Sequence, residues 1–201
     1  MTDKRLFAPS TARNREAILA VARDVFPATG TVLEIAAGAG EHAAYFAAAL
    51  PELTFLPSDP GEDARASIAA WIAHTGAGNI LPPLDLDAGA QSWPVKHADA
   101  IVCINMVHIS PWRVTQGLFR NARAVLAPEA PLLLYGPYRR GGAHTAPSNA
   151  AFDESLRSRN PEWGVRDVET VEACATQHGF ALERIYDMPA DNFSLLFRAG
   201  A

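Results

Sequence analysis

Val32-Leu-Glu-Ile-Ala-Ala-Gly-Ala-Gly-Glu-His42 is the stretch that decides the fold. Its apolar, β-branched start ends in Gly38-Ala-Gly40 and passes directly into an alanine-rich helical pattern. The pattern predicts a strand, a tight glycine turn and the beginning of a helix. Because glycine lets a ligand approach the backbone and a helix start presents unpaired N–H groups, we expect a ligand-binding loop here.

The acidic residue inside this strand, Glu34, narrows the choice of ligand. A carboxylate beside the pyrophosphate of a dinucleotide would repel it. The glycine loops of S-adenosylmethionine (SAM)-dependent methyltransferases usually carry such a residue, since their ligand has an ammonium and a sulfonium group. Gly38-x-Gly40-x-x-Ala43 also fits the dinucleotide fingerprint, so a nicotinamide cofactor stays open as an alternative.

Apolar periodicity predicts strands and helices that alternate along most of the chain, which implies a parallel sheet with helices on both faces. The final two strands are joined only by Asp187–Asn192, so they must be antiparallel. The expected strands are Thr31–Ala36, Leu53–Pro57, Ile80–Leu86, Ala98–Ile104, Pro131–Tyr135, Ala181–Tyr186 and Phe193–Arg198. The expected helices are Thr11–Phe26, Glu41–Leu50, Glu62–Thr75, Pro111–Leu126 and Asp167–His178.

This order predicts an α/β, Rossmann-like fold of the class I methyltransferase layout. We expect a mostly parallel seven-stranded sheet that ends in an antiparallel strand pair. With 201 residues, of which 49% are apolar, the chain is expected to form a single domain over residues 1–201.

Charge and composition restrict the partners. The net charge of −5 argues against broad nucleic-acid binding, and no apolar run is long enough to span a membrane. The amino-terminal residues lack the apolar core of a signal peptide, so a cytoplasmic location is expected. Cys103 and Cys174 lie in apolar segments and are expected to be buried free thiols. The sequence leaves the oligomeric state open.

Two acidic positions that follow strands are candidates for holding an adenosine. Asp59 lies 19 residues beyond Gly40, where a carboxylate can accept hydrogen bonds from both ribose hydroxyls, although a solvated loop aspartate is the simpler alternative. Asp85 and Leu86 follow the third strand, where a carboxylate and a backbone N–H could meet the adenine. Asp85 is preferred to Asp87 because it is nearer the strand; a simple turn is the alternative.

Three polar residues near later strand ends are candidates for catalysis. Asn105 could fix the methionine end of the cofactor or the incoming nucleophile. His108 could be a general base, or a partly buried histidine bonded to a backbone carbonyl. Tyr138 could project to the cavity rim, or pack as an ordinary core residue. The six histidines show no metal-ligand spacing, so no metal is expected.

Two further segments could complete the site. Arg13 and Asn14 open the first helix, which could cover the methionine end of the cofactor, although a charged helix start is the alternative. Residues 139–166 carry five arginines and three acidic residues, a net charge of +2 that reverses the sign of the whole chain. We therefore expect a substrate lid there that meets an anionic group; a solvated surface excursion is the alternative.

Seven motifs together resemble one family across nearly the whole chain. They are Ala12-Arg-Asn14, Leu33-Glu-Ile-Ala-Ala-Gly-Ala-Gly-Glu-His42, Pro57-Ser-Asp59, Cys103-Ile-Asn-Met-Val-His108, Tyr135-Gly-Pro-Tyr138, Arg159-Asn-Pro-Glu-Trp-Gly164 and Asp187-Met-Pro-Ala-Asp-Asn192. The chain is similar to a methyltransferase-like domain-of-unknown-function family found in bacteria and animals. The resemblance implies a class I fold with SAM as ligand and supplies no substrate. Ala36 departs from the common methyltransferase glycine, and should fit if its φ is negative.

The expected activity is therefore methyl transfer from SAM to a small molecule or a protein side chain, achieved mainly by positioning. A SAM-binding module that senses or scaffolds is the non-enzymatic alternative, and a nicotinamide-dependent oxidoreductase is the weaker enzymatic one. The residues expected to bind the cofactor are Arg13, Asn14, Glu34, Ala36, Gly38, Gly40, Asp59, Asp85, Leu86 and Asn105. Those expected to act in catalysis are His108, Asn105 and Tyr138.

Overall fold

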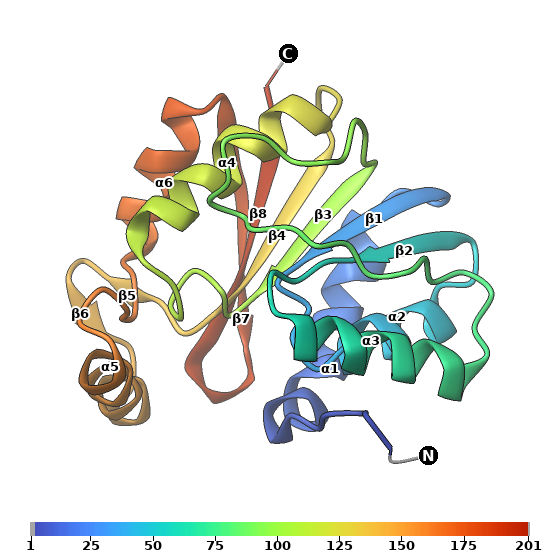
Figure 1. Cartoon of the computed structure of the whole chain (residues 1–201). Coiled ribbons are helices and arrows are strands. Elements are labelled where there is room, and N and C mark those ends of the chain that lie inside the picture. Colours follow the sequence, from blue (N-terminus) through green and yellow to red (C-terminus); the bar gives the residue numbers. More distant parts are fainter. Residues whose placement is uncertain (1–2, 201) are drawn as a thin grey trace.

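A twisted six-stranded sheet forms the centre of the molecule (Figure 1). The structure is a computed structural model and describes residues 3–200. The strands lie in the order β2-β1-β3-β4-β8-β7. Their bounds are β1 (Gly30–Ile35), β2 (Leu53–Pro57), β3 (Ala100–Ile104), β4 (Pro131–Gly136), β7 (Phe180–Met188) and β8 (Asn192–Ala199).

The first four strands of this sheet are parallel and the last two run against their neighbours. β1 lies between β2 and β3, with Leu33 opposite both Leu56 and Ile101. β8 is antiparallel to β4 and to β7, and only the short 3₁₀ turn Pro189–Asp191 joins β7 to β8. The α/β class and the terminal antiparallel pair predicted from the sequence are confirmed.

One predicted strand, Ile80–Leu86, does not form. The segment makes only two isolated parallel bridges to β2 and its end, Phe55 with Ile80 and Ser58 with Leu84. Pro82 and Pro83 lie between these bridges and have no N–H to donate, so a continuous ladder is impossible. The sheet therefore has six strands instead of seven.

Helices cover both faces of the sheet (Figure 1). On one face, α1 (Pro9–Val25) and α2 (Glu41–Ala49) pack through residues such as Ile18 and Phe46, with α3 (Glu62–Thr75) beside α2. On the other face, α4 (Trp112–Val125) and α6 (Val168–Gln177) enclose the larger core cluster. Within residues 3–200, no helix combines the length and apolarity that crossing a membrane requires.

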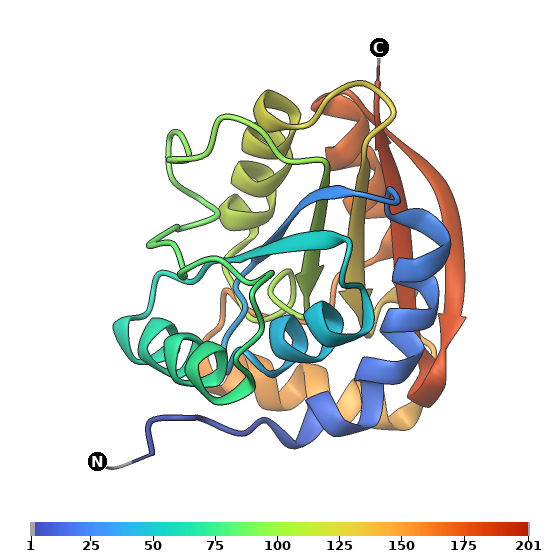
Figure 2. The same cartoon turned by 90° about the vertical axis from the view of Figure 1, so that its right-hand side faces the viewer.

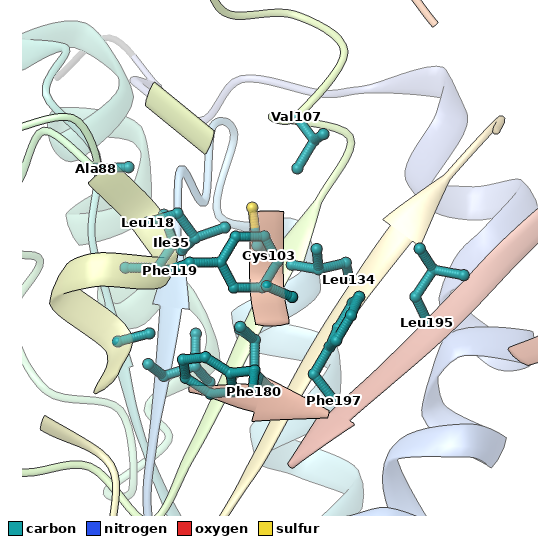
Figure 3. Close-up of a cluster of buried hydrophobic side chains, with 14 of the residues drawn as sticks. Ile35, Ala88, Cys103, Val107, Leu118, Phe119, Leu134, Phe180, Leu195 and Phe197 are labelled. Atoms are coloured by element: carbon teal, nitrogen blue, oxygen red, sulfur yellow. The ribbon is translucent and has the colours of Figure 1, made fainter. Parts of the chain in front are cut away.

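The larger core cluster is built around aromatic rings (Figure 3). The ring of Phe119 lies 5.7 Å from that of Phe180 and 5.3 Å from that of Phe197, in tilted and edge-on arrangements that aromatic pairs favour. Cys103 belongs to this cluster, and burial raises the pKa of its thiol to about 12. Cys103 and Cys174 are both buried and free, as the sequence predicted.

Residues 139–166 form an ordered, packed excursion. It contains the hairpin β5 (Arg139–Arg140) and β6 (Ala143–His144), followed by α5 (Pro147–Arg159). Leu156 and Val165 are fully buried, so the segment contributes to the core. Figure 2 shows α5 and the start of α1 at the same edge of the sheet, where the parallel strands end.

Candidate functional site

Three adjoining cavities lie where the parallel strands end, the edge at which α/β folds bind ligands. The Asp59 cavity (about 260 Å³) is lined by residues including Asp59, Asp87 and Ile109. The loop cavity (about 120 Å³) is lined by the glycine loop with Glu34, Glu41 and His42. The Arg13 cavity (about 260 Å³) is lined by Ser10, Arg13, Asn14, Asn105, Tyr135, Pro137, Ser148, Asn149, Phe152, Pro189, Ala190 and Asn192.

Shared residues connect the three cavities into one trough. Ala36 lines both the Asp59 cavity and the loop cavity. Ser10 and Asn105 line both the loop cavity and the Arg13 cavity. The loop cavity therefore lies in the middle, with the other two at its ends, and an elongated ligand in the first two would reach the Arg13 cavity at Asn105.

Glu34 is the fully buried acidic group of the loop cavity. Its side chain is 1% exposed, and its Oε2 has no hydrogen-bond partner. Burial, followed by repulsion from Asp59, raises the pKa of Glu34 to about 8. A buried carboxyl without a partner is unfavourable, and a cation in the loop cavity would relieve it.

The two glycines of the loop have different structural tasks. Gly38 has φ of 56°, and a Cβ there would meet nothing within 4 Å, so its backbone faces open space. Gly40 has φ of 88°, and a Cβ there would lie 2.9 Å from the Cα of Ile68 in α3. Gly38 is thus available to a ligand, whereas Gly40 permits α2 and α3 to pack closely.

Ala36 is strained, contrary to the expectation of a negative φ. Its φ is 55°, in the left-handed region that disfavours a side chain. Asn105, Ala190 and Asp191 also have positive φ, so four of the five such non-glycine residues in the described chain line or adjoin the trough. Strain of this kind gathers at ligand-binding and catalytic sites.

Asp59 ties the glycine loop to the end of β2. Its Oδ2 accepts the N–H of Gly38 at 3.0 Å, and its Oδ1 accepts the N–H of Gly61 at 2.8 Å. Each carboxylate oxygen has a second lone pair, so the group can still accept from two hydroxyls. Asp59 also lines the Asp59 cavity, and its contact with a ribose stays a prediction.

The structure separates the two aspartates at the end of the Ile80–Leu86 segment, Asp85 and Asp87. The side chain of Asp85 is 72% exposed and pairs with Arg65 at 3.1 Å, outside the cavities. Leu86 and Asp87 line the Asp59 cavity instead. Asp87 accepts the N–H of Gly89 in the turn that carries it back to the cavity wall. The position of Asp85, which was preferred from sequence, is thus outside the cavity, whereas that of Asp87 is at its wall.

Arg13 and Asn14 line the Arg13 cavity and do not reach the loop cavity directly. The Oδ1 of Asn14 is 2.9 Å from Nε2 of His42, and Tyr135 lines the Arg13 cavity beside Asn14. Burial, and then the charge of Arg15, lowers the pKa of His42 to about 4. The neutral ring thus holds Asn14 in place at the wall of the Arg13 cavity.

His108 and Tyr138 lie in the core and line none of the three cavities. Both are fully buried, with their rings 4.6 Å apart and edge-on. The Nδ1 of His108 accepts the N–H of Arg166 at 3.3 Å, and its carbonyl accepts the N–H of Gly164 at 2.9 Å. Burial, and then the charge of Arg166, lowers the pKa of His108 to about 3. Its position supports a structural role and not the predicted general base.

The arginines of residues 139–166 are also directed elsewhere. Arg139 pairs with Asp167, Arg157 with Asp153, and Arg166 donates to the carbonyls of Val107, Ser110 and Glu162. Arg140 lies over Phe193, and Arg159 over Trp163. The segment contributes Ser148, Asn149 and Phe152 to the Arg13 cavity, so the charge reversal does not face the site.

The segment before α1 covers the glycine loop. The N–H of Leu6 donates to Ser67 Oγ, which donates to the carbonyl of Ala39 in the loop. Phe7 packs edge-on against Trp71 at 5.3 Å. The amide of Ala8 donates to Glu41. The segment before α1 is thus held against the glycine loop, and Ala8 forms part of the wall of the loop cavity.

Sequence reasoning missed Ser10, Tyr135, Asn149 and Asn192 as members of the trough. Tyr135 belongs to β4, where alternate residues face opposite sides, so it faces α1 while Leu134 faces α4. Asn149 is 6% exposed and donates to Thr145 and to the carbonyl of Asp191. The order of motifs along the chain did not indicate that Asn149 and Asn192 lie together, because α5 and the Pro189–Asp191 turn meet only through tertiary packing.

Outside the trough, a fourth hollow of about 200 Å³ lies by the end of α1, lined by residues such as Arg23, Phe26 and Glu52. It is at the opposite edge of the sheet and holds no comparable cluster of polar groups. Among residues 3–200, no three or more His, Cys, Asp or Glu side chains are arranged to hold a metal ion.

A family model described as "Protein of unknown function (DUF938)" matches residues 5–199. Solved methyltransferases share the fold. Their matches to this chain include CalO1 of calicheamicin biosynthesis in an SAH-bound form (22% identity, TM-score 0.78, 96% of this chain and 54% of that one). They also include the mitomycin 7-O-methyltransferase MmcR (15%, 0.81, 95% and 54%) and an O-methyltransferase family protein from Burkholderia thailandensis (14%, 0.74, 93% and 58%). The chain thus has the class I methyltransferase fold and spans a little over half the length of these structures.

Proposed function

The chain belongs to the DUF938 family, and we propose that it is a methyltransferase that binds SAM in the Asp59 and loop cavities and its methyl acceptor in the Arg13 cavity. When bound, SAM supplies a sulfonium methyl group that passes to a nucleophile, while the electron pair of the broken bond stays on sulfur. The rest of the mechanism belongs to the protein's own residues.

The observation that carries the proposal is the buried, unpartnered carboxyl of Glu34 in the loop cavity. A cationic amino-acid group in that cavity would ionise Glu34 and satisfy its Oε2. A nicotinamide cofactor would bring an anionic pyrophosphate, which cannot relieve a buried, unpartnered carboxyl, so this feature favours SAM over the dinucleotide alternative.

The remaining cofactor contacts follow from the trough. Asp59 would accept from the ribose hydroxyls, and Asp87 with Leu86 would meet the adenine. Gly38 would let the ligand approach the loop backbone. Asn105 stands where the loop cavity meets the Arg13 cavity, so it would orient the methyl group and its acceptor. The proposed catalytic contribution of Asn105 is positioning.

The SAM-binding sensor or scaffold remains the second candidate. Methyl transfer requires open space beside the methyl group, and the Arg13 cavity provides it, which favours an enzyme. Residues 139–166 would form one wall of this acceptor cavity, through the first turns of α5, in a single domain.

Calorimetry tests the proposal. SAM and its product S-adenosylhomocysteine (SAH) should bind, while NAD and ATP should bind at least tenfold more weakly. Glu34→Gln should weaken SAM about ten- to a hundredfold, since a charge-assisted hydrogen bond contributes about 1.5–3 kcal/mol. Glu52→Gln, on the exposed opposite edge, is the matched control and should leave SAM affinity unchanged. Preferential binding of NAD would refute the proposal.

A further inference from the structure

The Arg13 cavity is unusual in its charge. Arg13 is its one cationic lining residue, and no aspartate or glutamate lines it, in a chain whose net charge is −5. The Arg13 side chain makes no hydrogen bond or ion pair with any other residue of the described range 3–200, whereas many other arginines are engaged. A cation left without a partner at a cavity wall suits an anionic ligand.

The neighbouring groups add hydrogen-bond donors. Tyr135 lines the cavity beside Asn14, and its hydroxyl is a group that can donate a proton to a ligand there. The ring of Phe152 supplies an apolar wall, and the first turn of α5 adds the positive end of its dipole through Ser148 and Asn149. The cavity therefore offers positive charge and donors beside an apolar face.

The cavity also lacks a base. Arg13 and Tyr135 are its only titratable lining residues, and burial raises the pKa of Tyr135. In the adjoining loop cavity, the titratable groups are Glu34, assigned to the cofactor ammonium, Glu41, bonded to the amide of Ala8, and His42, bonded to Asn14. An acceptor that had to lose a proton during attack would find no group placed to receive it.

From this geometry we infer that the acceptor is a small carboxylic acid, held by Arg13 and methylated on its own carboxylate oxygen. This inference rests on the proposed function. A carboxylate is already deprotonated near neutral pH, so it needs no base. The new bond joins a carboxylate oxygen to the methyl carbon, the sulfur–methyl bond breaks with its electron pair on sulfur, and no proton is released. The products are a neutral methyl ester and SAH.

The test uses the SAH-loaded protein and a panel of small aliphatic and aromatic carboxylic acids, each paired with its uncharged primary amide. Ligand-observed NMR should show binding of acids at least tenfold tighter than that of their amides. Arg13→Gln should abolish this preference while SAH affinity is unchanged. Arg23→Gln is the matched control, because Arg23 is an exposed arginine on the same helix at the opposite edge.

Acids that bind should then be incubated with methyl-labelled SAM. The expected product releases its label as volatile methanol on mild alkaline treatment, as a methyl ester does. Alkali-stable label on an acid that binds, equal binding of acids and amides, or a preference that survives Arg13→Gln would overturn the inference. Since SAH binding is measured in the same samples, its absence would instead indicate that the proposed function has failed.

Discussion

Replacing Glu34 by glutamine isolates the penalty of burying an unpartnered carboxyl. The side chain is 1% exposed, and the pKa of Glu34 is about 8 in the folded protein against 4.5 for the ordinary group. Between these two values the folded protein keeps a proton that the unfolded chain has released. The free energy of unfolding must therefore fall as pH rises across this window. Below pH 4.5, Glu34 is protonated in both states and causes no such loss.

The size of the effect follows from the same two values. One pKa unit corresponds to about 1.4 kcal/mol, so between pH 4.5 and pH 7 the wild-type protein should lose about 3 kcal/mol relative to a variant that has no charge there. Glutamine has nearly the shape of the protonated carboxyl and does not titrate. Glu34→Gln should thus match the wild type near the lower end of the window and exceed it by up to about 3 kcal/mol at pH 7.

Urea unfolding of the ligand-free proteins at several pH values between about 5 and 8 measures this difference directly. Glu52→Gln, an exposed glutamate at the opposite edge, should give a difference close to zero throughout. Saturating SAH should narrow the gap at pH 7, because its ammonium group would stabilise ionised Glu34. Parallel stability curves for wild type and Glu34→Gln would show that Glu34 does not titrate in this window, and would refute the reasoning.

Three further predictions concern neighbouring residues. Asp59→Ala and Asp87→Ala should each weaken SAM binding measured by calorimetry, Asp59→Ala by about ten- to a hundredfold. Asp85→Ala should change SAM binding little, because the Asp85 side chain pairs with Arg65 outside the cavities. A larger effect of Asp85→Ala than of Asp87→Ala would restore the interpretation from sequence. Gly40→Ala should destabilise the protein in thermal unfolding by more than about 2 kcal/mol, because its Cβ would press on Ile68, while Gly38→Ala should lose about 1–2 kcal/mol from left-handed strain alone. His108→Gln should lower the melting temperature but leave the shape of the pH–rate profile unchanged, since the ring is buried away from the trough; loss of an acidic limb from that profile would identify His108 as a base after all.

The local parts of this fold were accessible from sequence because they depend on neighbouring residues. The strand, glycine turn and helix of residues 30–49 follow from apolar periodicity and from Gly38 and Gly40. The alternation of elements then gave the parallel sheet and its antiparallel end. Glu34 lies on β1 and Asp59 just beyond the end of β2, and both line the trough, because parallel neighbouring strands end at the same edge of the sheet. Their contacts with the cofactor stay a prediction.

The tertiary structure alone decided which polar side chains enter the trough. Asp85 pairs with Arg65 of α3 and not with a group in the trough. Arg139 and Arg157, from residues 139–166, pair with Asp167 and Asp153. Tyr138 lies beyond the end of β4, where strand alternation no longer predicts direction, and its ring entered the core while Tyr135 faced the cavity. The Arg13 cavity joins the start of α1 to α5 and the β7–β8 turn, segments far apart in the chain. Sequence periodicity reports which face of an element is buried, but the direction of a polar side chain at a loop or element end depends on partners that only folding brings near.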